Sequence, residues 1–190
     1  MLIGELTLAA DIGRRLDALG VIWLIGGSVA SSLLGEARTT ADVDLVADLR
    51  AQDIKAFCDA VAPDYYVDED TARWAVSTRR SFNLIDNVTI TKIDVFCCKD
   101  DPLSRDQLAR RIFVEAGGLR LPLPSPEDII LQKLLWHREA GRTSDRQLRD
   151  ALGVARVHAQ TLDLTYLERQ ATIAGLTEAL HALLDQREPR

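Results

Sequence analysis

The chain has 190 residues, of which 47% are hydrophobic, so it can bury the core of one domain or of one small domain with a helical extension. Its formal net charge of −6 disfavours a broad electrostatic grip on nucleic acid, although a local basic groove is compatible with it. No apolar run approaches the ~20 residues that cross a bilayer, and the first residues lack the basic and apolar regions of a signal peptide, so we expect a cytoplasmic protein with no membrane segment.

The N-terminal part alternates helical and strand-like segments around one glycine turn. Apolar residues at helical spacing predict a helix over 5–19, and the short β-branched run 21–25 predicts a buried strand. The next predicted features, in chain order, are a tight turn at Gly26 and Gly27, a helix capped by Ser28 that continues through Leu34, a polar loop at Arg38, Thr39 and Thr40, and a strand that opens with Asp42, Val43 and Asp44.

Asp42 and Asp44 lie two residues apart in this strand, so we expect both side chains on one face, with Val43 pointing into the core. Neighbouring carboxylates repel each other unless a cation lies between them, and Mg²⁺ is commonly held by one or two carboxylates together with substrate phosphates. Backbone N–H groups at the start of the helix behind the glycine turn attract anions such as phosphate. Taken alone, such an Asp pair is more often a solvated edge or turn than a metal site.

The rest of the chain is predicted to complete the sheet and then to become helical. Before Pro124 the predicted elements are helices over 50–60 and 71–78, strands over 64–67, 81–85 and 89–97, a loop with a short helix over 100–111, and a hairpin of 111–116 and 119–123 around Gly117 and Gly118. The acidic run 68–70 is interpreted as a solvated loop or a helix start. After a proline-rich hinge, helices are predicted over 125–136, 144–158, 163–174 and 177–186.

Asp94 stands out in the strand predicted over 89–97, because a carboxylate in an apolar strand is costly to bury unless it is paired or bound to a metal. The alternative is an edge strand on which Asp94 faces water.

The cysteines Cys58, Cys97 and Cys98 are odd in number and lack zinc-site spacing. We therefore expect three reduced, apolar side chains rather than a disulfide framework.

The ordered features around the glycine turn resemble the polymerase-beta-like nucleotidyltransferase superfamily, whose signature is a Gly-Ser turn, a short helix and a strand with Asp-x-Asp. In that superfamily a third carboxylate, matched here by Asp94, sits on a later strand. Arg38, a threonine, Asp42 and Asp44 are also similar to the first motif of the abortive-infection type II nucleotidyltransferase toxins, and Lys92-Ile93-Asp94 is similar to the second.

Two further toxin motifs have counterparts in the helical part. The segment Ser125 to Leu134 resembles the third motif, and by that match Lys133 contacts nucleotide phosphate, whereas most helical lysines are simply solvated. The fourth motif has two closely spaced aspartates, but here Asp145 and Asp150 are five positions apart. We prefer Asp145 as the match and regard Asp150 as structural, although Asp145 is also placed to interact with the dipole of its helix.

The resemblance implies an α/β (α+β) protein in which a mixed sheet flanked by helices is followed by a helical C-terminal segment. We expect a catalytic core over 1–124 and helices over 125–190 packed on it. The implied reaction transfers an NMP from an NTP such as ATP to an acceptor hydroxyl, with release of pyrophosphate. Mg²⁺ or Mn²⁺ would be held by Asp42, Asp44 and Asp94, and nucleotide by Gly26, Gly27, Ser28, Arg38, Lys133 and Asp145.

The acceptor is open: the family modifies RNA 3′ ends such as those of tRNA, protein hydroxyls or small antibiotics, and the toxin resemblance implies an antitoxin partner. Two alternatives remain: a non-catalytic nucleotide-binding or regulatory module of the same fold, and an unrelated α/β protein. The second alternative predicts that Asp94 lies far from Asp42 and Asp44.

Overall fold

The computed structural model describes residues 2–37, 42–141 and 144–186, and within these the chain divides into two compact units. The first unit comprises Met1–Val29 and Thr39–Leu123, and the second comprises Ala30–Arg38 and Pro124–Arg190. The boundary therefore falls inside helix α2 (Gly27–Leu34), whose first turn belongs to the first unit. Arg38 lies outside the described residues.

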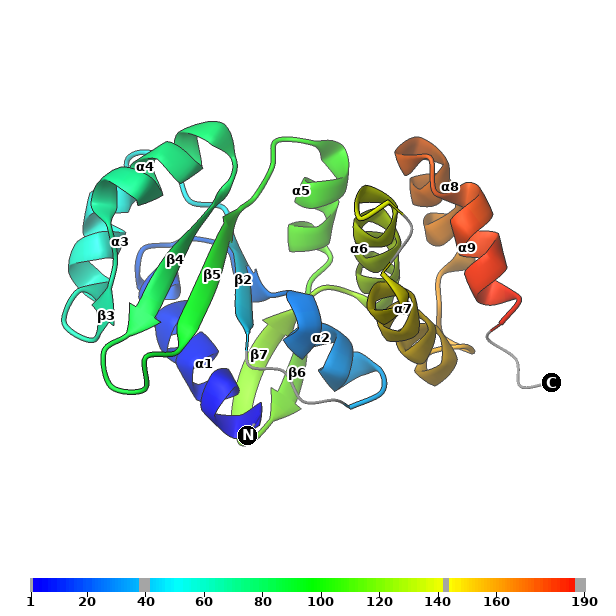
Figure 1. Cartoon of the computed structure of the whole chain (residues 1–190), viewed down its shortest axis with the longest axis horizontal. Helices are drawn as coiled ribbons and strands as arrows, with labels where there is room; N and C mark the ends of the chain where they lie inside the picture. The colour runs from blue at the N-terminus through cyan, green and yellow to red at the C-terminus, as the bar shows by residue number, and fades with distance from the viewer. Residues whose placement is uncertain (1, 38–41, 142–143, 187–190) are drawn as a thin grey trace. The chain divides into compact units, whose positions relative to one another are not determined.

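A five-stranded mixed sheet, in the order β1-β2-β5-β4-β3, forms the first unit's centre (Figure 1). Its strands are β1 (Trp23–Ile25), β2 (Val43–Ala47), β3 (Tyr65–Tyr66), β4 (Ser81–Asp86) and β5 (Lys92–Cys97). Strands β2 and β5 run parallel, and the other three neighbouring pairs are antiparallel. This confirms the expected mixed sheet, and it places Asp94 on the central strand instead of an edge.

The two faces of the sheet have different environments. Trp23 and Leu45 belong to the fully buried face, which α1 (Leu2–Ala18) covers so closely that a Cβ added at Gly13 would lie 1.9 Å from the Trp23 ring. Helices α3 (Ile54–Val61) and α4 (Glu69–Thr78) complete this layer. Positions 44 and 46 of β2 and 94 and 96 of β5 belong to the other face and are only half-buried. This alternation follows from the two-residue period of a strand, and it leaves one face partly open for chemistry.

The remaining elements of the first unit cover part of that second face and one edge of the sheet. Leu108 of α5 (Pro102–Ala109) packs with Leu24 and Val46. The predicted hairpin is confirmed as β6 (Ile112–Ala116) and β7 (Leu119–Leu123), with both turn glycines at positive φ.

Three predicted bounds shift because a carboxylate makes a local hydrogen bond. Asp53 accepts from the Arg50 backbone N–H, so α3 begins after this turn. Asp68 caps α4 through the Thr71 N–H, which selects the helix-start interpretation of the acidic run. Asp86 accepts from Thr89, and the turn that follows delays β5 until Lys92.

The second unit contains four C-terminal helices, which the sequence predicts, and the remainder of α2, which the sequence analysis assigned to the catalytic core. They are α6 (Pro126–Glu139), α7 (Asp145–Val157), α8 (Leu164–Ala174) and α9 (Thr177–Leu184). Ser125 caps α6 by accepting a hydrogen bond from the Asp128 N–H at 3.2 Å. The end of α2 meets α7 so closely that a Cβ at Gly35 would lie 2.8 Å from the Val154 backbone nitrogen. None of the helices in the described ranges is long and apolar enough to cross a membrane.

Candidate active site

The glycine turn is in direct contact with Asp44, the second acid of the Asp-x-Asp pair. The Gly26 N–H donates to the Asp44 carbonyl oxygen at 2.9 Å, and a Cβ at Gly27 would lie only 1.7 Å from Asp44 Oδ2. Gly27 also has a positive φ of 59°. The chain therefore needs glycine at this position for two reasons: the backbone conformation, and the approach of the Asp44 carboxylate to the start of α2.

Asp44 and Asp94 are direct register partners on the parallel strands β2 and β5. Register partners share a sheet face, and neighbouring strands lie about 4.8 Å apart, so the two carboxylates are adjacent on the half-buried face. The alternative in which Asp94 lies far from the Asp-x-Asp strand is contradicted by this pairing. Two separate regions of sequence thus bring their acids to one place.

Asp42 directly precedes β2 and is exposed. Lys92 is two residues before Asp94 on β5, and its Nζ lies 3.0 Å from Asp94 Oδ2. The Lys92 side chain is 53% exposed, whereas that of Asp94 is 19% exposed. The exposed Lys92 ammonium thus partly neutralises the negative charge of Asp44 and Asp94 on their solvent-facing side.

Asn83 is a neighbour of this pair that the sequence did not reveal. It lies on β4 directly opposite Asp94 and is exposed, so its amide extends the row formed by Gly26, Asp44 and Asp94 across the sheet. Only the register of β4 against β5 identifies it, because no local pattern distinguishes this asparagine from any other in a strand.

Carboxylate oxygens of the Asp44–Asp94 pair are the donors that Mg²⁺ or Mn²⁺ prefers. Among the residues with described positions, no group of three or more His, Cys, Asp and Glu side chains is close enough together to hold a metal ion. The metal-binding carboxylates that the described residues bring together here are therefore two, Asp44 and Asp94. A pair fits Mg²⁺, because this ion keeps several waters and takes further oxygens from substrate phosphates.

The other predicted nucleotide-binding residues of the first unit lie at the start of α2. The helix begins at Gly27, two residues earlier than a cap at Ser28 would imply, so Ser28 is its second residue, and it is buried.

Lys133 and Asp145 belong to the second unit and differ sharply in exposure. Lys133 is buried, and its Nζ lies 2.8 Å from Asp150 Oδ2 and 5.3 Å from the centre of the Trp136 ring. Ser31 of α2 donates to the same Asp150 oxygen at 3.2 Å. Asp145 is exposed at the first position of α7. Asp150, not Asp145, is thus the acid that pairs with Lys133.

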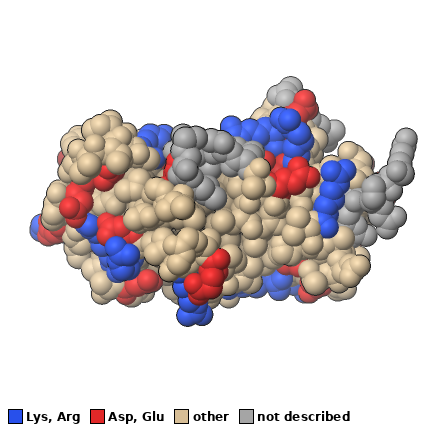
Figure 2. Space-filling model, turned by 90° about the horizontal axis from the view of Figure 1, so that it is seen from below, with Lys and Arg blue, Asp and Glu red and all other residues tan. Residues whose placement is uncertain are grey.

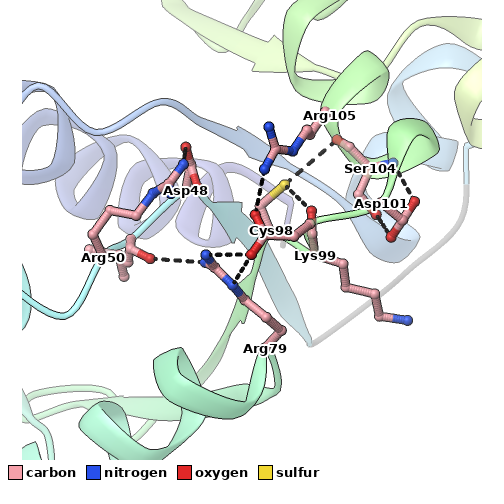
Figure 3. Close-up of polar contacts among 10 residues, drawn as sticks. Asp48, Arg50, Arg79, Cys98, Lys99, Asp101, Ser104 and Arg105 are labelled. Carbon is pink, nitrogen blue, oxygen red and sulfur yellow. Dashed lines mark hydrogen bonds and ion pairs between the residues drawn. The ribbon is translucent and has the colours of Figure 1, made fainter.

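The other ends of β2 and β5 carry a different polar cluster (Figure 3). There, Arg79 and Arg105 both pair with Asp100, at 2.9 and 2.8 Å, and Arg50 pairs with Asp48 at 2.8 Å. Burial raises the pKa of the neighbouring Cys98 thiol to about 11, so this sulfur is protonated at neutral pH and is not a nucleophile. These contacts attach the segment before α5 to the sheet, while the aspartate pair occupies the opposite strand ends.

Neither a protein-family model nor a curated protein sequence matches this chain. Several solved structures share its fold. An antigenic nucleotidyltransferase-like protein from Paracoccidioides brasiliensis superposes with a TM-score of 0.59 at 20% identity, covering 94% of this chain and 91% of that one.

Two further proteins, both with names that refer to antibiotics, have the same fold. The antibiotic-resistance factor ANT(2'')-Ia gives a TM-score of 0.58 at 15% identity, over 96% of this chain and all of its own. The lincosamide antibiotic adenylyltransferase LnuA, solved with lincomycin bound, gives 0.53 at 13% identity, over 81% of this chain and 96% of its own. The mixed sheet and its helices are therefore the fold of nucleotidyltransferases.

Proposed function

We propose that this protein is a metal-dependent nucleotidyltransferase that moves an NMP group from an NTP to an acceptor hydroxyl and releases pyrophosphate. The observation that carries the proposal is the register pairing of Asp44 with Asp94 beside the Gly27 turn, on the half-buried face of a nucleotidyltransferase-type sheet. The acid pair lies beside the start of α2, and helix starts are common binding positions for phosphate groups.

In this mechanism the chain positions the triphosphate and removes one proton. Backbone N–H groups of Gly27 and Ser28 bind phosphate oxygens at the start of α2. Asp44 and Asp94 would hold Mg²⁺, with the exposed Asp42 beside them as a further ligand, and the ion would supply positive charge to the phosphoryl oxygens. Asp94 accepts the proton of the attacking hydroxyl, and Lys92, whose Nζ lies 3.0 Å from Asp94 Oδ2, exchanges this partner for a phosphate oxygen.

We further propose that the acceptor is a small hydroxylated molecule. ANT(2'')-Ia and LnuA are named for antibiotics, and each is covered almost completely by this chain. The net charge is −6, and Figure 2 shows a face on which acidic and basic side chains are intermixed among uncharged ones. Such a face does not favour a long polyanion as acceptor. A toxin-like reaction on RNA or protein, controlled by an antitoxin, is the second candidate and rests on the motif resemblance.

The test uses purified protein, Mg²⁺, each α-labelled NTP in turn, and either a panel of hydroxylated antibiotics or a cell extract. We expect label on a low-molecular-weight product together with stoichiometric pyrophosphate. Label on RNA or protein would favour the toxin-like reaction instead. Nucleotide binding by calorimetry without pyrophosphate release would identify a non-catalytic module.

Asp44→Asn and Asp94→Asn should each lower the transfer rate at least about 100-fold, because each removes a charge where the phosphoryl group reacts. The matched control is Asp59→Asn, which removes an exposed carboxylate that pairs with Lys55 on α3. Circular dichroism should show all three variants folded. Full activity in a folded Asp44→Asn protein would refute the mechanism.

A further inference from the structure

A cavity lies in the first unit, at the end of β1 opposite the glycine turn. Its volume is about 250 Å³, and its walls come from the end of α1, the start of β1 and one face of the β6–β7 hairpin. Since β1 has only three residues, the cavity is separated from the Gly26–Gly27 turn by roughly 10 Å of strand. No residue of the aspartate row lines it.

The hairpin wall carries two arginines around one aromatic ring. The strand period puts Arg111 and Phe113 on one face, and the register places Pro122 and Arg120 on the same face across the hairpin. The guanidinium carbon of Arg120 lies 4.4 Å from the centre of the Phe113 ring, and that of Arg111 lies 5.8 Å from it. Phe113 is 49% exposed, so part of this ring faces solvent beside the two guanidinium groups.

The acids nearest to these two arginines are Glu115, which is the register partner of Arg120 across the hairpin, and Asp17, which also lines the cavity. Within the described part of the chain, neither Arg111 nor Arg120 forms an ion pair with a carboxylate. Arg111 is oriented by donating one N–H to the Leu108 carbonyl oxygen at 2.9 Å, which leaves its other donors available. Two guanidinium groups beside one ring repel each other, and an anion between them would remove that repulsion.

The opposite wall is mainly apolar and contains one acid, Asp17. Trp23 donates its indole N–H to Asp17 at 2.8 Å, which occupies one oxygen of the only acid lining the described cavity. Val21 and Ile22 add aliphatic surface, and Ile22 is 45% exposed. The cavity thus combines aliphatic surface on one side with two guanidinium groups and the Phe113 ring on the other.

We propose that this cavity binds a small planar organic anion, namely an aromatic ring bearing one carboxylate or one phosphate monoester. The guanidinium groups bind the anion through paired N–H donors, and the ring stacks on Phe113. A volume of about 250 Å³ is below the roughly 300–1,000 Å³ of pockets for drug-sized ligands, so the ligand is one ring with its anionic group and not a nucleoside triphosphate.

The experiment is a titration of ¹⁵N-labelled full-length protein, without NTP or metal, followed at the tryptophan indole N–H resonances. Phenyl phosphate and benzoate are the probes, and phenol and inorganic phosphate are the matched compounds that lack the charge or the ring. We expect the first two to shift the Trp23 resonance, assigned with Trp23→Phe, while the resonances of Trp74 and Trp136 stay in place. Phenol and inorganic phosphate should bind at least ten times more weakly. The stronger of the two probes distinguishes a carboxylate ligand from a phosphate ligand.

Arg111→Ala and Arg120→Ala should each raise the Kd of the probes at least tenfold, whereas Arg73→Ala, which removes an exposed arginine on α4, should leave it unchanged. Unchanged binding in both cavity variants would overturn the proposal. So would equal binding of phenyl phosphate and inorganic phosphate, or of phenyl phosphate and phenol, in the wild-type protein, a comparison that does not depend on any variant folding.

Discussion

At the scale of single residues, Gly27 decides how the candidate site is assembled. Its φ of 59° is one that L side chains rarely adopt, and the space where a Cβ would go is taken by the Asp44 carboxylate. The absence of a Cβ atom at Gly27 therefore allows both the sharp turn and the contact between this turn and the Asp44 carboxylate.

Gly27→Ala should reduce nucleotide transfer almost as much as Asp44→Asn, because the new methyl group must displace the Asp44 carboxylate. It should also cost about 1–2 kcal/mol of stability through the left-handed backbone conformation. Gly117→Ala is the matched control, since Gly117 has the same φ of 59° but open space around it. Urea unfolding and a pyrophosphate assay measure the two effects; a Gly27→Ala protein as active as Gly117→Ala would show that the contact with Asp44 is unimportant.

Asp86 is a second residue whose chemistry is local, and it makes stability depend on pH. Its carboxylate accepts hydrogen bonds from the backbone N–H and the hydroxyl of Thr89, both at 2.6 Å. The hydrogen bonds from Thr89 lower the pKa of Asp86 below its usual value. A carboxyl with a lowered folded-state pKa stabilises the fold above its ordinary pKa of about 3.9, and this stabilisation is lost as the pH falls through the folded value.

The free energy of unfolding of the wild-type protein should therefore decrease on acidification below about pH 4, and Asp86→Asn should show a smaller decrease over the same interval. Chemical unfolding at several pH values between about 2 and 6 measures this. Asp59→Asn, at an exposed site, serves as the reference and should follow the wild-type curve. Parallel curves for wild type and Asp86→Asn would mean that the hydrogen bonds from Thr89 do not stabilise the ionised form of Asp86.

At the scale of elements, a buried ion pair joins α6 to α7 in the second unit. Lys133 on α6 and Asp150 on α7 have side chains only 3% and 7% exposed, and Ser31 extends the contact to α2. Helices α6 and α7 follow each other in the sequence, whereas Ser31 lies 119 residues before Asp150, so one carboxylate connects a distant helix to this pair. Whether Lys133 also contacts phosphate stays a prediction, because a buried lysine with a partner already has a structural role.

Asp150→Ala should destabilise the protein by about 3–5 kcal/mol, because the buried Lys133 ammonium loses the carboxylate 2.8 Å away. Replacing both partners, as in the double variant Lys133→Met with Asp150→Leu, should cost much less. Glu36→Ala is the control: its pair with Arg156 is exposed and long, at 3.8 Å, and should contribute less than about 1 kcal/mol. Thermal and urea unfolding provide the comparison, and equal losses for Asp150→Ala and Glu36→Ala would contradict the assignment.

At the scale of the whole molecule, the cysteines report on global opening. All three are buried and free, as the sequence predicts. Burial raises the pKa of Cys58, Cys97 and Cys98 to about 11, so few thiolates exist at neutral pH.

The native protein should therefore react with Ellman's reagent slowly at pH 7.5, with a rate that tracks unfolding, while protein in concentrated guanidinium chloride should release three equivalents at once. Stopped-flow absorbance measures both reactions. Fast release of one equivalent from the folded protein would identify a thiol that is accessible, contrary to the burial of all three.

The sequence by itself determined the order of the elements, the glycine turn, the hairpin around Gly117 and the cap at Ser125. All of these depend on neighbours within a few residues, where turn geometry, strand period and capping act directly. The resemblance of motifs also selected Asp44 and Asp94 before any geometry was known, because chemistry restricts which residue types such a strand can carry.

Only the tertiary structure decided that Asp44 faces Asp94, that Asn83 extends their row, that Asp150 pairs with Lys133, and that Arg111, Phe113 and Arg120 frame a cavity. Each of these depends on strand register or helix packing between different elements of the chain. Register is set by the summed burial of whole faces, and a shift of one residue would turn every side chain of a strand to the other face. The residue pattern of one strand does not contain this information, so the pairing of strands across the sheet is visible only in the tertiary structure.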